Sequence, residues 1–355
     1  RSGILTSVHA FAVDPTRGSF ILALLAINIG AALTLFGLRA ASVTEGERFA
    51  LTSREGALVF NNVMLSATLG IVLFGTLYPL LTEAFGAQVS VGPPYFNPMG
   101  ALFVIPMLVV MAVGPLLRWR RDSLARIRGQ LIGPAVLVGL TAIGLVLWAP
   151  VGTLPFMGLA LAGGLAVASV LPLRGRRLRT VKLPLWGMVI AHLGVAVSLF
   201  GMASDSAFTE EKLVARKVGE TAEVGPWTVR LNAVEPVAGP NWTALQASIT
   251  ARYCGGAGQV VEPQARAFWA PPQTTSESAL LTRWNGQLYL VLGERGDDGR
   301  WQLRLWWKPF VTLIWIGGLM IALGGVLALL GRVASDMRRI VARDKIAFRR
   351  MRQGR

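Results

Sequence analysis

The stretch LPLWGMVIAHLGVAVSLFG, Leu183–Gly201, consists of apolar and small residues with one ionisable side chain, His192. At a rise of about 1.5 Å per residue, His192 lies about 12 Å from Pro184, close to the middle of a hydrocarbon core about 30 Å thick. Ionisable side chains at that depth are costly and usually face the inside of a helix bundle, so His192 is a candidate functional residue. A neutral imidazole can ligate a metal; a hydrogen bond to a neighbouring helix is the alternative interpretation.

The same segment carries small residues on one helix face, at Gly187, Ala191, Gly194 and Ser198. Side chains this small let a second helix, or a flat cofactor, come close to the helix backbone. Both interpretations stay open on these residues alone.

The composition is typical of a polytopic membrane protein rather than a soluble globular one, because 53% of the 355 residues are hydrophobic and 15% charged. The single cysteine, Cys254, gives the chain no CxxC pair for thiol redox chemistry. His9 and His192 are the two histidines, so a metal site made of this chain's histidines has at most two ligands. Because the sequence begins without Met, we expect it to be the C-terminal piece of a longer protein or one half of a split one.

Apolar runs predict a polytopic α-helical membrane protein of about seven spans, with one small external all-β domain inserted before the last span. The Pro- and Gly-rich stretch VGPPYFNP, 91–98, predicts a loop. The expected spans are 19–38, 56–78, 100–117, 131–149, 156–173, 183–201 and 309–331. The expected division is an external segment 1–18, membrane helices 19–201, a β domain 202–308, the seventh span 309–331 and a basic tail 332–355.

The charge distribution orients these spans. The net charge of +16 comes from Lys and Arg in the links after spans one, three and five and in the tail, whereas 202–308 holds 11 basic and 11 acidic residues. By the positive-inside rule, the basic links are cytoplasmic and 202–308 lies on the periplasmic side. We therefore expect a multi-pass protein of the bacterial inner membrane, with the mitochondrial inner membrane as the less favoured location and no nucleic-acid partner.

The region 202–308 is expected to form a small barrel or sandwich of six short strands. Asn285-Gly286 predicts a two-residue hairpin turn, and Glu210–Lys217 has the pattern of a helix. The expected strands are Trp227–Val234, Ala244–Tyr253, Val260–Trp269, Leu280–Trp284, Leu288–Leu292 and Trp301–Trp307.

Sequence motifs for acid–base or nucleophilic catalysis are missing: there is no GxSxG, HExxH or P-loop, and no carboxylate lies deep in a span. Gly163-Gly164 and Gly317-Gly318 sit inside spans, where helix packing is the favoured interpretation. His9 in SVHAFA lies on the external side and is either merely exposed or functional. Trp306-Trp307 before the last span fit an aromatic belt at the membrane surface.

Five ordered blocks resemble the C-terminal half of the CcmF family, the integral-membrane component of the cytochrome c maturation (System I) haem lyase. The blocks are RSGILTSVHAFAVDPTRG (1–18), SREGALVFNNVMLSATLGIVLFGTLYPL (53–80), VGPPYFNP (91–98), AHLGVAV (191–197) and WWKPFVTLIWIGGLMIALGGVLAL (306–329).

This resemblance implies four histidines, of which a transmembrane pair holds a b-type haem and an external pair flanks a tryptophan-rich segment where a second haem docks. His192 matches the second transmembrane histidine and His9 the second external one. The cofactors implied are haem b, with its other axial ligand from a portion preceding Arg1, and a transient substrate haem. The activity implied is thioether formation with the CxxCH motif of apocytochrome c, without an acid–base catalytic residue in this chain.

The partners implied are the N-terminal half of the protein or a split partner, the haem chaperone CcmE, the CcmH/CcmI module and apocytochrome c. Weaker site candidates are Trp306, Trp307, Tyr95 and Phe96, which could line a docking surface, and Arg17, which could approach haem propionates.

Two other functions remain as alternatives. A haem transporter or exporter needs polar groups in mid-membrane, and Asn28, Thr34, Asn61 and Asn62 offer thin support. A membrane scaffold would use the spans only to anchor the β domain to biogenesis partners.

Overall fold

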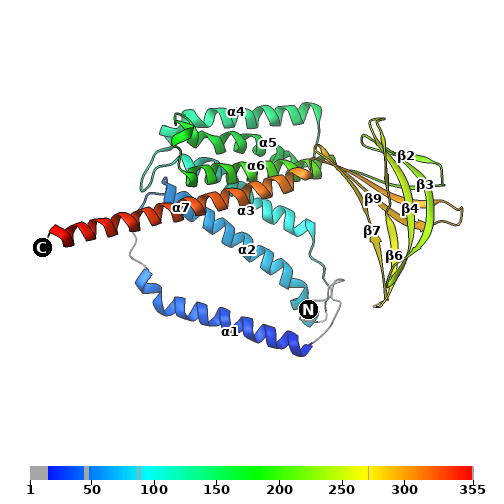
Figure 1. Ribbon diagram of the computed structural model, residues 1–355, viewed down its shortest axis with the longest axis horizontal. Helices are drawn as coiled ribbons and strands as arrows, with labels where there is room; N and C mark the ends of the chain where they lie inside the picture. The colour runs from blue at the N-terminus through cyan, green and yellow to red at the C-terminus, as the bar shows by residue number, and fades with distance from the viewer. Residues whose placement is uncertain (1–14, 44–47, 86, 88, 271, 354–355) are drawn as a thin grey trace. The chain divides into compact units, whose positions relative to one another are not determined.

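The computed structural model describes residues 15–353 apart from 44–47, 86, 88 and 271. Contacts divide the chain into two compact units, Arg1–Arg128 and Gly129–Arg355. Figure 1 shows the helices and strands of both units.

The first unit is helical. It contains α1 (Pro15–Arg39), α2 (Arg54–Ala84) and α3 (Pro93–Val113), and α3 packs against α2. The apolar segments Arg54–Pro79 and Pro93–Leu116 are long enough to cross a membrane, whereas that of α1, Ala23–Arg39, is shorter.

The prediction of a loop at 91–98 was wrong from Pro93 onward, because α3 begins there. Gly92 is the extended N-cap residue, and its carbonyl accepts hydrogen bonds from the Tyr95 N–H at 3.0 Å and the Phe96 N–H at 3.2 Å. Proline is well tolerated in the first turn of a helix, since the N–H it lacks has no partner in the helix at that position. The prolines therefore start the helix here.

The link between α3 and α4 (Leu124–Trp148) is organised by Asp122. Its carboxylate accepts hydrogen bonds from the Arg118 N–H at 2.8 Å, the Ser123 N–H at 2.7 Å and the Arg126 Nε–H at 2.8 Å. The Asp122 backbone also pairs with Thr52 before α2, with its N–H 2.8 Å from the Thr52 carbonyl oxygen. These donors, the Arg126 guanidinium above all, hold the pKa of the Asp122 carboxyl well below its usual range.

We expect Asp122→Asn to loosen this link, because an amide accepts fewer hydrogen bonds and carries no charge for Arg126. At pH 7, amide hydrogen exchange measured by mass spectrometry should become faster in 117–123 and stay unchanged in the later link 174–182. A carboxyl with a lowered folded-state pKa stabilises fully above its unfolded-state pKa of about 3.9 and loses that contribution as the pH falls further. Protection in the unsubstituted chain should thus persist down to about pH 4 and decline below it; equal protection in both chains at pH 7 would contradict this role.

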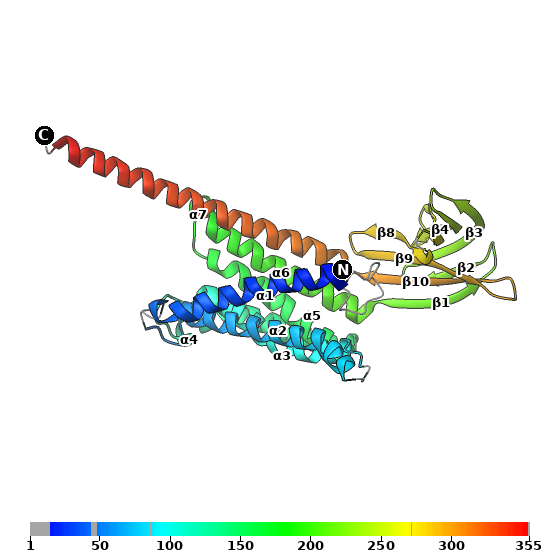
Figure 2. The ribbon, with the colours of Figure 1, turned by 90° about the horizontal axis from the view of Figure 1, so that it is seen from below.

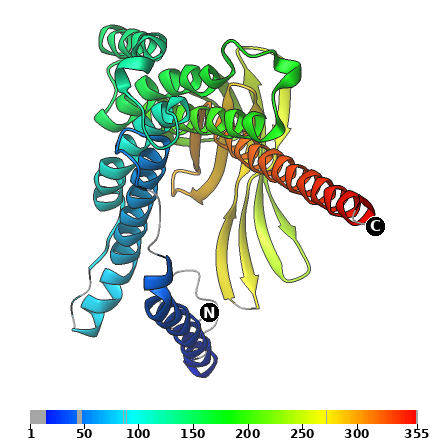
Figure 3. The same ribbon diagram turned by 90° about the vertical axis from the view of Figure 1, so that its left-hand side faces the viewer.

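The second unit holds most of α4 together with α5 (Thr153–Val170), α6 (Leu183–Phe208) and α7 (Thr312–Gln353). These helices lie side by side in a row (Figures 1 and 3). Gly163 and Gly164 on α5 face Leu137 and Val138 on α4, α6 packs on α5, and α7 packs on α6. Of the described residues, six helices have the length and apolar character of membrane spans. With the shorter α1, six to seven apolar helices are able to span a membrane, which confirms the predicted polytopic fold of about seven spans.

Residues 210–309 form a β-sandwich between α6 and α7, which confirms the predicted all-β domain (Figure 2). One sheet has the strand order β1-β10-β9-β8, and the other β2-β3-β4-β6-β7 with β5 beside β4. Alternate residues of β9 are buried in the core between the sheets, as the period of two in a strand requires. The strands are β1 (Glu210–Arg216), β2 (Thr221–Val224), β3 (Trp227–Ala238), β4 (Trp242–Tyr253), β5 (Gly258–Val261), β6 (Gln264–Trp269), β7 (Pro272–Glu277), β8 (Ala279–Arg283), β9 (Gly286–Arg295) and β10 (Trp301–Pro309).

Four predictions in this domain need correction. Ten strands are present among its described residues where six were expected, because β2 and β7 were not predicted, β1 was expected to be a helix, and β5 and β6 were expected to be one strand. The segment expected to be helical, Glu210–Lys217, is strand β1, because pairing with β10 along its whole length outweighs its weak helical preference. The hairpin is present, but its two loop residues are Trp284-Asn285, since Arg283 pairs with Gly286. The strand expected at Val260–Trp269 is broken at the buried Pro263, which has no N–H for the ladder.

The sandwich joins the helices through very short links. α6 ends at Phe208 and β1 begins at Glu210, while β10 ends at Pro309 and α7 begins at Thr312. β1 and β10 are antiparallel partners, with Glu210 opposite Trp307. The Thr209 hydroxyl donates to the Asp205 carboxylate at 2.9 Å, and Lys308 Nζ lies 3.5 Å from the same carboxylate oxygen, so both links are fastened at one point.

Candidate functional site

The small-residue face of α6 is occupied by α7. A Cβ atom added to Gly194 would lie 2.8 Å from the Met320 Cβ and 2.9 Å from the Ile321 nitrogen, closer than real Cβ contacts allow. The Ser198 hydroxyl donates to the Ile314 carbonyl of α7 at 3.2 Å. Of the two interpretations of this face, the second helix is therefore the one that the structure supports.

The close approach repeats every seven residues. Glycines on α6 meet α7 backbone or side-chain atoms at Gly187, Gly194 and Gly201, and glycines on α7 meet α6 at Gly317, Gly324 and Gly331. A period of seven keeps one seam of each helix facing the other when two helices wind around each other in a left-handed sense. The interface thus fixes the rotation of α6 about its own axis.

His192 lies on a different face of α6. At about 100° per residue, it is about 140° around the helix from Gly187, on the side shared with Leu199 and Ala203. That side packs on α5, where a Cβ added to Gly158 would lie 2.8 Å from the Ala203 Cβ and 3.7 Å from Leu199 Cδ1. The His192 residue is half-buried.

The chemistry of an imidazole in this setting allows it to act as a metal ligand. A half-buried imidazole in mid-helix, on a face not taken by α7, can supply one nitrogen ligand to a haem iron. Within the described part of the chain, no group of three His, Cys, Asp or Glu side chains could hold a metal ion by itself.

The other histidine, His9, lies outside the described residues, and its predicted role as a ligand of a docked haem stays a prediction. Arg17 lies in the first turn of α1, and its side chain is also outside the described part.

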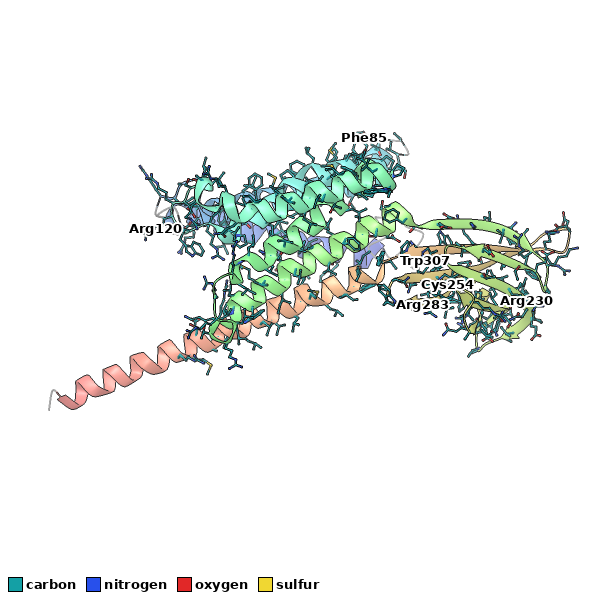
Figure 4. The ribbon with its side chains drawn as sticks, turned by 90° about the horizontal axis from the view of Figure 1, so that it is seen from above. Phe85, Arg120, Arg230, Cys254, Arg283 and Trp307 are labelled. Carbon is teal, nitrogen blue, oxygen red and sulfur yellow. The ribbon has the colours of Figure 1, made fainter. Side chains whose placement is uncertain are left out.

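The two adjacent tryptophans of β10 occupy opposite faces of the strand. Trp307 is 7% exposed and packs in the core, with its ring centroid 6.4 Å from that of Tyr253 (Figure 4). Trp306 is half-buried on the outer face, with its ring 5.0 Å from that of Tyr289. Trp306 is thus the one of the pair with part of its surface open to a partner.

Tyr95 and Phe96 pack against α2 within the first unit. Their ring atoms occupy the space where a Cβ on Gly75 would lie, and the Tyr95 hydroxyl donates to the Ile71 carbonyl at 3.4 Å. Tyr95 lines a cavity of about 700 Å³ together with Phe74 and Tyr78. These rings therefore hold α2 and α3 together and border a small apolar cavity.

Exposed aromatic residues that the sequence analysis missed surround the junction between the sandwich and the helices. Trp284 at the β8–β9 loop is 80% exposed, and Trp315 in the first turn of α7 is 76% exposed. The Phe310 N–H donates to the Asn285 carbonyl at 2.9 Å, which ties this loop to the start of α7. Tryptophan beside the start of a span indicates an aromatic belt at the membrane surface. For Trp284 this signal is visible only when the β8–β9 loop is known to lie at the start of α7.

Comparison with known proteins gives this architecture a family. The model of the CcmF C-terminal beta-sandwich matches residues 207–309. The cytochrome c-type biogenesis protein CycK of Rhizobium meliloti is 39% identical over 348 residues, which are 94% of this chain and 51% of the relative. CcmF of Escherichia coli is 39% identical over 336 residues, 93% of this chain and 52% of the relative.

The chain belongs to the CcmF family. It spans about half the length of the curated relatives it matches. A solved structure of cytochrome c heme lyase CcmF has the same fold, with a TM-score of 0.72 at 23% identity over 90% of this chain and 51% of the other. The predicted resemblance to the CcmF family is thereby confirmed.

Proposed function

We propose that this chain is a haem-handling component of cytochrome c biogenesis, in which His192 supplies one axial nitrogen to a b-type haem among the membrane helices. The observation that carries the proposal is the half-buried His192 in mid-α6, on a face that α7 leaves to the rest of the bundle. The relatives at 39% identity are cytochrome c-type biogenesis proteins. When bound by two imidazoles, a buried haem supplies one-electron transfer at a potential tuned by its ligands and burial.

The residues of this chain would position and insulate such a group. The α6–α7 seam fixes the rotation of α6, and thus the direction of the imidazole. The α5 face packs beside it and keeps water away. The second axial ligand would come from a portion of the protein preceding Arg1 or from a split partner.

The external parts of the chain would receive the substrates. We propose that the sandwich lies on the periplasmic side, that His9 ligates a second haem during its transfer, and that the haem chaperone CcmE, the CcmH/CcmI module and apocytochrome c dock there. In this proposal the contribution of the chain is the positioning of haem and thiols. The half-exposed Trp306 is the aromatic candidate for that surface.

The test is the absorption spectrum of the chain purified from membranes together with its upstream portion. We expect His192→Ala to abolish the b-type bands, because one axial bond to iron is lost, while the protein stays in the membrane. Leu199→Ala is the matched control, since it lies on the same face two turns along and removes packing but no ligand. His9→Ala should also leave the b-type bands intact and block release of holocytochrome c. A b-type spectrum that survives His192→Ala unchanged would refute the assignment.

A further inference from the structure

The second unit has a cavity at the end of the α6–α7 pair that is farther from the sandwich. It has a volume of about 920 Å³ and is formed by the α5–α6 link, the start of α6 and the segment of α7 around Gly331. We refer to it as the basic pocket. Its basic side chains are Arg179, Lys182, Arg332 and Arg338, and its acidic one is Asp336.

Four cations and one acidic side chain line the basic pocket, so its charge is positive. Among the described side chains, none of the four cations forms an ion pair with an acidic group. All four are exposed. The excess of three positive charges therefore remains available to an anion from outside the chain.

The start of α6 adds to this field. Its N-cap residue, Lys182, makes no side-chain hydrogen bond to the first turn. Pro184 in the first turn has no N–H, and the N–H groups of Leu185 and Trp186 donate to the Lys182 carbonyl. What favours a negative charge at this position is therefore the positive end of the helix dipole.

The remaining wall of the pocket is apolar. Leu183, Pro184 and Ala334 line it, and Pro184 contacts Gly331 so closely that an added Cβ there would clash. The apolar segment of α6 begins at Leu183, and that of α7 ends at Arg338. The pocket therefore lies where the membrane core gives way to the headgroup layer, on the side that the positive-inside rule makes cytoplasmic.

We propose that the basic pocket binds the phosphodiester headgroup of an anionic phospholipid, with the first acyl carbons against Leu183 and Pro184. Basic pockets between membrane helices on this side suit such headgroups. A free phosphate would use the cations but not the apolar wall, so the combination favours the lipid.

The test compares lipid retention by the full chain purified in detergent, measured by native mass spectrometry after addition of cardiolipin, phosphatidylglycerol or phosphatidylcholine. The chain should retain the two anionic lipids and not phosphatidylcholine. In the variant R179Q/K182Q/R332Q, the retention of anionic lipid should fall by about tenfold or more, since each cation near the membrane surface contributes to the attraction.

The matched control is R174Q/R176Q/R177Q. It removes the same charge from the same link, but none of these residues lines the pocket. This variant should retain anionic lipid to within about twofold of the unsubstituted chain. Measuring its insertion into the membrane also shows whether loss of charge from the link is enough to disturb the topology. An equal loss in both variants would mean diffuse attraction, and no loss in either would mean no site; both overturn the proposal. Displacement of the lipid by inorganic phosphate at equal phosphorus concentration would also overturn it, in favour of a soluble anion.

Discussion

Replacing Gly324 with leucine should separate α6 from α7. A Cβ added at Gly324 would lie 2.6 Å from the Ala191 nitrogen and 2.7 Å from the Ala191 Cβ, so the new side chain meets backbone that cannot move aside by a rotamer change. Overpacking of a tight interface costs about 1–3 kcal/mol and sometimes more, and here three further carbons follow the Cβ. We expect a lower thermal unfolding midpoint for the full chain in detergent, together with loss of the b-type spectrum, because α6 carries His192.

The chain supplies its own control for this experiment. No heavy atom lies within 4 Å of a Cβ added at the neighbouring Gly325. Gly325→Leu therefore adds the same atoms one residue away without touching α6, and leucine has a higher helix propensity than glycine. Its unfolding midpoint should be unchanged or higher. Equal destabilisation by both variants would show that the seam of glycines is not what holds the two helices.

The second large effect is expected from Trp227→Ala. Trp227 is 1% exposed in the core of the sandwich, and its ring lies 5.2 Å from that of Tyr253. Truncating a buried tryptophan to alanine costs about 3–5 kcal/mol, from lost burial and the cavity that remains, which is a large share of the stability of a domain this size. We expect limited proteolysis to cut within 210–309 in the variant under conditions that leave the unsubstituted chain intact.

Trp284→Ala is the matched control, because Trp284 is 80% exposed. Surface substitutions usually change stability by less than about 0.5 kcal/mol, so the protease pattern should not change. If Trp284→Ala opened the sandwich as much as Trp227→Ala, the core assignment would be wrong.

The membrane helices could be predicted from apolar length alone, because a span needs about twenty apolar residues whatever its neighbours are. Their ends could not. α7 continues to Gln353, far past the expected end at 331, because Ala, Arg, Lys and Met in the basic tail are good helix formers. The prediction of a loop at Pro93 fails because proline both starts and breaks helices, and only the position of the N-cap separates the two cases.

The sandwich shows where sequence patterns stop being sufficient. The hairpin was recognisable from local turn chemistry, but β1 depends on a partner almost a hundred residues away, and its own residues favour no strand. Trp306 and Trp307 are indistinguishable in the sequence, because only the register of β10 decides which of two adjacent side chains faces the core.

At the candidate site, the position of His192 within a span was predictable from spacing, whereas its face was not. The stripe through Gly187 and Gly194 was compatible with a flat cofactor until α7 was found against it. A stripe of small residues indicates only that some neighbour approaches the helix backbone closely. Which neighbour does so is a property of the whole fold.

The one- and two-residue links at Thr209 and at Phe310-Val311 have a mechanical consequence. Because α6 and α7 continue almost directly into the paired strands β1 and β10, we expect the two helices and the sandwich to move together. A tilt imposed on the sandwich by a docked protein would turn α6 and α7 together and reach the depth of His192 as a displacement. If the proposed haem lies beside His192, such a displacement would couple protein docking at the sandwich to the geometry of the haem site.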